Sequence, residues 1–202
     1  MSAVTATLGH NLERLTLTGG ATIDGSGNGL ANVITGNAAS NVLTGFGGAD
    51  TLDGNGGNDT FSYWAIADST AAASDMINGF DAGDRIDLLR IDANLNASAN
   101  NAFTFVGGNA FSGTAGELRA VDQGGNSWTI EADVNGDGIA DLVDVAEAPA
   151  PPQAGDSGGG AVDATEASHG VRYLQLSARV ERLDNLRLDH LHGGLQRHIG
   201  RG

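Results

Sequence analysis

A nine-residue repeat constrains this chain more than any other feature. Residues 26–61 divide into four consecutive units, SGNGLANVI, TGNAASNVL, TGFGGADTL and DGNGGNDTF. Each unit has glycine at its second position, asparagine or aspartate at its seventh and a large apolar residue at its ninth. Glycine permits tight turns because it adopts left-handed backbone angles, and the residues that close each unit favour a short strand. The repeat therefore predicts a stacked solenoid in which two units make one coil, rather than a flexible glycine linker, which needs no periodic apolar residue.

The polar position of each unit recurs one coil later. Asp50 lies 18 residues after Asn32 in one column, and Asp59 lies 18 residues after Asn41 in the other. We expect Asp68, a further 18 residues on, to continue the first column, although its segment YWAIAD has lost the glycines. Stacked carboxylates repel one another, and a cation held between the turns by carboxylate and carbonyl oxygens removes that cost.

Composition narrows the choice of partner. The chain has a net charge of -15, ten cationic side chains that are all arginine, and no cysteine. So acidic a surface repels nucleic acid and anionic lipid, and without thiolates a metal site must use oxygen ligands, which hard cations such as Ca²⁺ prefer. No stretch is apolar enough for a membrane span, and the first residues do not read as a cleaved signal peptide.

Two of the units carry a recognisable motif. GFGGAD (45–50) and GNGGND (54–59), each followed by threonine and an apolar residue, resemble the calcium-binding RTX nonapeptide G-G-x-G-x-D-x-U-x. Phe46 and Asn55 replace its second glycine; asparagine tolerates left-handed angles and phenylalanine resists them, so the turn at Phe46 departs further from the motif. The two earlier units have asparagine in place of aspartate and are expected to carry weaker charge.

The stretches that follow resemble the C-terminal domain of serralysin-type metalloproteases. They are NDTFSYWAIADS (58–69), SDMINGFDAGDRIDLLRID (74–92), AFTFVGG (102–108), GELRAV (116–121) and WTIEADVNGDGIADLVDV (128–145), with LGHNLERLTLTG (8–19) as a similar lead-in. The resemblance implies an all-β fold, a parallel β-roll followed by additional strands, which binds several Ca²⁺ ions and accompanies type I secretion. By position it implies turn carbonyls and aspartates as ligands: Gly45, Gly47, Gly48 and Asp50, then Gly54, Gly56, Gly57 and Asp59, with Asp68 and Asp75 closing the last sites.

The chemistry of that family is not expected here. Its zinc signature H-E-x-x-H-x-x-G-x-x-H does not occur in the sequence, and no nucleophile and base pair stands out. We therefore expect no catalytic centre in this chain, which we interpret as the C-terminal part of a larger protein.

A second calcium candidate rests on spacing alone. Residues 133–144, DVNGDGIADLVD, place oxygen ligands at loop positions 1, 3, 5, 9 and 12 of an EF-hand-type loop: Asp133, Asn135, Asp137, Asp141 and Asp144. Gly138 takes the sharp-turn position, and the Ile139 carbonyl would serve at position 7. Because both flanks read as strands, a hairpin without metal is an equal alternative.

Another acidic run lies between these motifs. Asp81, Asp84, Asp87 and Asp92 alternate with apolar residues. We interpret them as a solvated strand edge or turn in preference to a metal site.

The composition changes near residue 146. Residues 1–146 have 18 acids and four arginines, whereas residues 147–202 have seven acids and six arginines. EAPAPPQAGDSGGG reads as a linker, and VRYLQLSARVERLDNLRLDHLHGGL has the spacing of a short helix. His190 and His192 are read as surface residues rather than a metal site, because no third ligand is evident. We expect this tail to come from a frameshift or an altered stop.

These observations divide the chain into lead-in strands (1–25), RTX repeats (26–75), a flanking β region (76–146) and an atypical linker and tail (147–202). The function predicted is a calcium-binding module that folds on binding Ca²⁺ and supports the secretion and stability of a larger extracellular protein. The alternative is a structural repeat segment of a secreted adhesin or matrix protein, which predicts many more repeats upstream in the gene.

Overall fold

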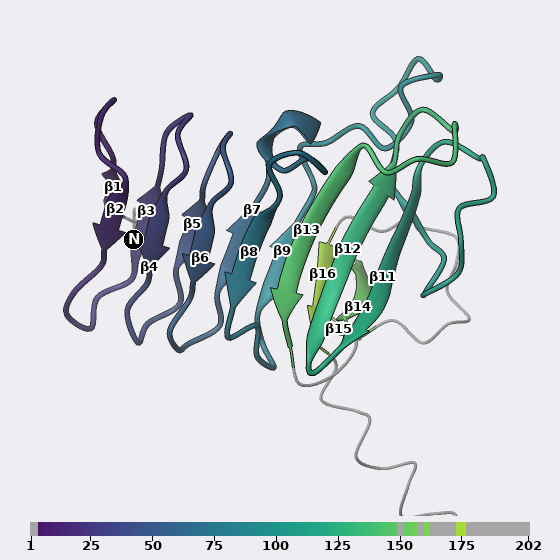
Figure 1. Cartoon of the computed structure of the whole chain (residues 1–202). Coiled ribbons are helices and arrows are strands. Elements are labelled where there is room, and N and C mark those ends of the chain that lie inside the picture. The colour runs from purple at the N-terminus through teal and green to yellow at the C-terminus, as the bar shows by residue number, and fades with distance from the viewer. Residues whose placement is uncertain (1–3, 149–151, 157–159, 162–172, 177–202) are drawn as a thin grey trace, which may run out of the picture.

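The described part of this computed structural model covers residues 4–148, 152–156, 160–161 and 173–176. The fold is all-β, as the sequence predicts, and its strands form two sheets wound into a roll (Figure 1). Among the described residues the one helical segment is a single 3-10 turn, η1 (Ile66–Asp68).

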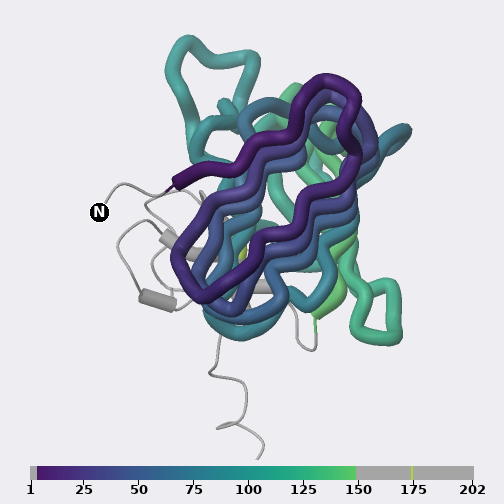
Figure 2. Tube along the Cα trace, turned by 90° about the vertical axis from the view of Figure 1, so that its left-hand side faces the viewer, coloured from purple at the N-terminus to yellow at the C-terminus, as the bar shows by residue number. Residues whose placement is uncertain are grey.

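The chain alternates between the two sheets as it winds. The first sheet contains β1 (Val4–Thr7), β3 (Ile23–Ser26), β5 (Val42–Thr44), β7 (Thr60–Ser62) and β9 (Arg85–Asp87). The second contains β2 (Arg14–Thr16), β4 (Val33–Thr35), β6 (Thr51–Asp53) and β8 (Asp75–Asn78). Neighbours pair in parallel, and a view along the stack shows the coils superimposed from β1 onward (Figure 2). The residues read as a lead-in are thus the first coil and part of the second.

The apolar column of the repeat forms the core. Ile34 pairs with Leu52 in the second sheet, and Leu43 pairs with Phe61 in the first. All four side chains are buried. A thin core of one large side chain per strand suits a chain with few aromatic residues.

The roll continues past residue 75, the boundary expected from the repeats. Leu52 pairs next with Ile77, and Phe61 with Ile86, so the register advances by 25 residues at this coil instead of 18. Seven residues, YWAIADS (63–69), are inserted, after which TAAASDMIN and GFDAGDRID resume the nine-residue period.

An antiparallel unit extends the second sheet. It comprises β11 (Glu117–Gly124), β12 (Ser127–Asp133) and β13 (Leu142–Glu147), with the short β10 (Thr104–Phe105) parallel to β11. Strand β13 pairs in parallel with β8 and so joins this unit to the last coil. The two strands predicted on either side of the NGDG sequence are confirmed.

The first sheet is extended by a segment of the tail. Strand β16 (Tyr173–Leu176) pairs antiparallel with β9, followed by β14 (Pro152–Asp156) and β15 (Gly160–Ala161). The helix predicted from residue 171 onward is wrong for 173–176: β9 offers an unpaired strand edge, and Leu174 is buried beside Ile86. The rest of that prediction, with His190 and His192, lies outside the described residues. No helix in the described part is long and apolar enough to cross a membrane.

Two glycines are required where the coils approach most closely. A Cβ on Gly48 would lie 2.6 Å from the Leu30 carbonyl carbon, and one on Gly57 would lie 2.8 Å from that of Ala39. Both glycines also have positive φ angles, of 124° and 122°. Glycine at this position therefore sets the distance between successive coils.

We predict that Gly57→Ala destabilises the roll by about 2–5 kcal/mol, combining a strained backbone with an overpacked contact. Gly56→Ala is the matched control, because a Cβ there meets no atom within 4 Å. Denaturant unfolding in saturating Ca²⁺ measures both variants. Equal stability of the two would contradict the close-approach argument.

Candidate metal sites at the turns of the roll

The turns of the roll form two stacks, one at each end of the strands. The first turn stack contains residues 27–32, 45–50 and 63–74, and leads from the first sheet to the second. The second turn stack contains residues 36–41, 54–59 and 79–84, and leads back. The predicted ligands at residues 45–59 therefore belong to opposite ends of the roll.

The asparagine turns close with their own hydrogen bonds. Asn28 N donates to Asn32 Oδ1 at 2.8 Å, and Asn37 N donates to Asn41 Oδ1 at 2.8 Å. The Asn41 side-chain amide also donates to the Ile23 carbonyl at 2.6 Å. A carboxamide is a donor and an acceptor, so these turns satisfy their buried groups without a cation.

The aspartate turns lack that second half. Asp50 Oδ1 accepts from Asn32 N at 2.7 Å, and Asp59 Oδ1 accepts from Asn41 N at 2.8 Å. Asp50 Oδ2 is buried and has no hydrogen-bond partner in the described part of the chain. A buried oxygen with no donor is costly, and a cation is the partner that a carboxylate can accept in place of one.

Each of these aspartates lies against the first glycine of its own turn. A Cβ on Gly45 would lie 2.1 Å from Asp50 Oδ2, and one on Gly54 would lie 2.3 Å from Asp59 Oδ2. The Gly45 carbonyl in turn lies close to Gly27 of the preceding coil. The structure thus brings Gly45 to Asp50 and Gly54 to Asp59. The ligand roles of Gly47, Gly48, Gly56 and Gly57 remain predictions.

The register of the first column differs from the prediction for Asp68. Asp50 N donates to Asp75 Oδ1 at 2.9 Å, so Asp75 follows Asp50 in the ladder and the expected place of Asp68 is wrong. The cause is the insertion, which moves the next strand by seven residues. Asp68 stays in the first turn stack, where its Oδ2 accepts from Trp64 N at 2.7 Å and its charge raises the pKa of Asp50.

Asp84 is a member of the second column that the sequence reading missed. Its Oδ1 accepts from Asp59 N at 2.8 Å, its Oδ2 accepts from Asp81 N at 3.0 Å, and it is buried. The interpretation of a solvated edge is therefore wrong for Asp84. The nine-residue spacing between Asp75 and Asp84, in units that resume after the insertion, was the signal that could have identified it.

Phe46 adopts the left-handed conformation that the motif requires, with φ of 66°. Its ring packs edge-on against Trp64, with centroids 5.1 Å apart, and the Arg90 guanidinium lies 4.2 Å above the Trp64 ring. The aromatic contact offsets part of the strain that a bulky residue has at positive φ.

A third carboxylate continues the first column into the antiparallel unit. Asp144 of β13 is the backbone partner of Asp75 in β8, and its Oδ2 accepts from the Tyr63 hydroxyl at 2.8 Å. Asp144 therefore cannot serve as the twelfth ligand of the 133–144 loop: β13 is a strand, in which each residue advances about 3.3 Å, so Asp144 is carried away from the loop. A helix after the loop would have returned it.

Burial is the main cause of raised pKa values along the columns. It raises the pKa of Asp50 and of Asp59 to about 6, and that of Asp144 to about 7. Burial together with the charges of Asp144 and Asp50 raises the pKa of Asp75 to about 8. The pKa of Asp84 is raised as well, again mainly by burial. The folded chain thus resists carrying these charges unneutralised.

The 133–141 loop is a compact turn whose acids are bonded to its own backbone. Asp133 is buried and accepts from the amides of Asn135, Gly136 and Gly138 at 3.2, 2.6 and 2.9 Å. Gly138 has φ of 82°, as the sharp-turn position requires.

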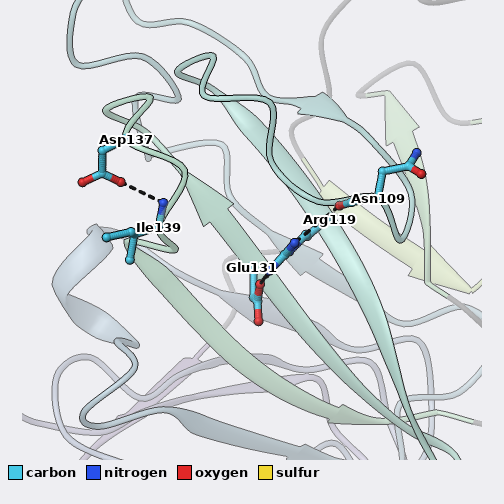
Figure 3. Close-up of polar contacts among 5 residues, drawn as sticks. All are labelled: Asn109, Arg119, Glu131, Asp137 and Ile139. Atoms are coloured by element: carbon cyan, nitrogen blue, oxygen red, sulfur yellow. Dashed lines mark hydrogen bonds and ion pairs between the residues drawn. The ribbon is translucent and has the colours of Figure 1, made fainter.

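The remaining loop acids form an inner and an outer contact. Asp141 accepts from Val134 N through one oxygen and from the Asn135 side chain through the other. Asp137 bonds only Ile139 N, on a part of the loop separate from the Arg119–Glu131 ion pair (Figure 3). The loop is therefore closed without an ion and presents one carboxylate, that of Asp137, to solvent.

The donor set fits Ca²⁺ better than other metals. It consists of carboxylates and backbone carbonyls, with no sulfur, and hard cations take six to eight such oxygens. Within the described ranges, no three histidine, cysteine, aspartate or glutamate side chains are placed to hold one ion. A cation at the turns therefore needs carbonyl oxygens besides the one or two carboxylates available.

Comparison with known proteins agrees with this architecture. A protein-family model described as Peptidase M10 serralysin C terminal matches residues 14–148. The metalloprotease AprA of Pseudomonas entomophila (strain L48) is 55% identical over 119 residues, which are 58% of this chain and 24% of that protein. The match thus spans about a quarter of that relative's length.

We predict that, in chelator, the folded state loses stability as pH rises from about 4 to about 8. The buried aspartates have folded pKa values of about 6 to 8 against 3.8 ordinarily, so the folded chain binds more protons in this window. Their contribution is complete below pH 3.8 and is lost as pH passes through the folded values, at about 1.4 kcal/mol per pKa unit. Circular dichroism in chelator between pH 5 and 8 measures it, and β-structure that increases with pH would contradict it. The same series in Ca²⁺ is the control and should be flatter.

Proposed function

This chain belongs to the peptidase M10 serralysin C-terminal family, and from that premise we propose that it is a calcium-binding module whose folding depends on Ca²⁺. The observation that carries the proposal is the set of buried aspartates in the turn stacks, each oriented by one backbone amide of the preceding coil. The unpartnered Asp50 Oδ2 is the clearest case.

The proposed ligands are those implied by the motif, with the register that the structure gives. Asp50 and Asp59 would act with carbonyls of their own turns, Gly45, Gly47 and Gly48 in the first stack and Gly54, Gly56 and Gly57 in the second. Asp68 and Asp75 would serve the last turn of the first stack. Asp84 joins the set as the next acid after Asp59.

The residues of the roll explain why folding would depend on the cation. Without it, closing the turns brings like-charged carboxylates together and buries them, so the acid columns favour the open chain. Asn32 and Asn41, in contrast, close their turns unaided and give the roll a preformed first part. Bound Ca²⁺ supplies the positive charge that the columns lack, and its binding free energy becomes folding free energy.

The 133–141 loop is proposed as a separate site with Asp133, Asn135, Asp137 and Asp141 as side-chain ligands. Its support is the glycine turn at position 6 and the convergence of the loop amides and acids on Asp133. Because the loop closes with its own hydrogen bonds, this site would not drive folding. It would tighten a hairpin that is already formed.

The wider role follows from the relative. The matching protein is named a metalloprotease, and only a quarter of its length is covered. We propose that this chain is the C-terminal, non-catalytic part of such a protein, that it stays loose inside the cell where Ca²⁺ is scarce, and that it folds outside after type I secretion.

The first test is far-UV circular dichroism of the full chain during a Ca²⁺ titration, with Mg²⁺ as control. We expect a cooperative change from coil to β-structure with Ca²⁺ alone, because Mg²⁺ demands a smaller octahedral site and gives up water reluctantly. A spectrum that is already β-rich at pH 8 in chelator and indifferent to Ca²⁺ would reject the folding switch and favour a purely structural repeat.

A second test replaces one charge in the column. Asp59→Asn keeps the acceptor for Asn41 N but loses a charged ligand, so the Ca²⁺ concentration at the folding midpoint should rise about tenfold or more. Glu13→Gln, at an exposed position in the lead-in, removes the same charge elsewhere and should leave the midpoint nearly unchanged. Equal effects of the two variants would show that net charge, not a site, governs the transition.

A further inference from the structure

Three aspartates on neighbouring strands repeat one arrangement. Asp50, Asp75 and Asp144 are all buried, and each has one carboxylate oxygen bonded and the other unpartnered within the described chain. Asn32 N holds Asp50, Asp50 N holds Asp75, and the Tyr63 hydroxyl holds Asp144. The first two belong to the parallel roll, whereas Asp144 belongs to the antiparallel unit.

The backbone brings the last two carboxylates together. Asp75 and Asp144 are directly paired in the parallel ladder of β8 and β13, and neighbouring strands lie about 4.8 Å apart. Both side chains are on the buried faces of their strands, with Ile77 on one and Leu142 on the other. Their free oxygens, Asp75 Oδ2 and Asp144 Oδ1, are therefore enclosed at the junction between the roll and the antiparallel unit.

The surroundings do not neutralise this pair. The neighbouring charges that act on Asp75 are those of Asp144 and Asp50, both negative. Tyr63, buried beside them, donates one hydrogen bond but no charge, and the acids raise its own pKa further. Two buried carboxylates on adjacent strands need either a shared proton or a cation.

We propose that Asp75 and Asp144 jointly bind a divalent cation of the Ca²⁺ class, which fastens the antiparallel unit to the last coil of the roll. Tyr63 is the positioning residue: it occupies Asp144 Oδ2 and leaves Oδ1 for the cation. This inference rests on the proposed calcium-dependent function and adds a site outside the repeat motif. Calcium-dependent order would then extend through β13 to β12 and β11.

The experiment is a direct count of bound Ca²⁺ by equilibrium dialysis and metal analysis on the full chain at pH 8. Asp144→Asn should bind one ion fewer per chain than the unaltered protein, and amide hydrogen exchange in Ca²⁺ should be faster in β12 and β13 but not in β4 to β7. Asp122→Asn, an exposed acid in β11, is the matched control and should change neither. Circular dichroism in Ca²⁺ verifies that each variant still forms the roll.

Tyr63→Phe provides an independent variant. It keeps both carboxylates but releases Asp144 Oδ2, so the ion count at saturation should stay the same while the Ca²⁺ concentration needed to protect β13 from exchange rises. An unchanged ion count and unchanged exchange in Asp144→Asn would overturn the inference, and the pair would then share a proton. If the unaltered chain binds no Ca²⁺ at all, the proposed function fails together with this site, whereas normal binding that ignores Asp144→Asn rejects this site alone.

Discussion

The conflict between stacking and charge governs this structure. The coils pack because one apolar side chain per unit, from Ile34 to Leu52 to Ile77, lies on the next. The same stacking brings aspartates of successive coils into line, where each accepts an amide of the preceding coil and loses water. The hydrogen bond fixes the carboxylate but leaves its charge, so burial and repulsion oppose the packing that creates them. A cation of the right size resolves the conflict, and glycine turns supply the carbonyl oxygens and the close approach that such a cation needs.

Much of the fold could be predicted because the repeat encodes both strand and turn. A fixed apolar position and a fixed glycine position determine which side chain is internal and where the coil reverses, so the parallel roll and its core follow from the sequence. The register beyond Phe61 did not follow, since a seven-residue insertion leaves each unit intact but changes which units are neighbours. Counting by 18 leads to Asp68, while the hydrogen bond from Asp50 N goes to Asp75. Asp84 was missed for the same reason.

The remaining errors came from local patterns whose outcome depends on distant partners. Asp144 fits position 12 of a calcium loop by spacing, yet the strand that follows the loop pairs with β8 and carries Asp144 to Asp75. Residues 173–176 have apolar spacing compatible with a helix, but the free edge of β9 satisfies their backbone as a strand. In both cases the strand pairing, which involves residues more than 60 positions away, determines the conformation that the local sequence leaves open.

The insertion explains how the least motif-like turn is nonetheless kept. Phe46 stands where the motif has glycine, and its positive φ is unfavourable for an aromatic residue. Trp64, the second residue of the insertion, packs on the Phe46 ring, and its amide orients Asp68. One short segment thus compensates for the strained turn and supplies an acid to the same turn stack. A regular coil at this place would have neither the Trp64 ring nor the six further residues between Asp68 and Asp75, so the departure from periodicity is what allows Phe46 in the turn.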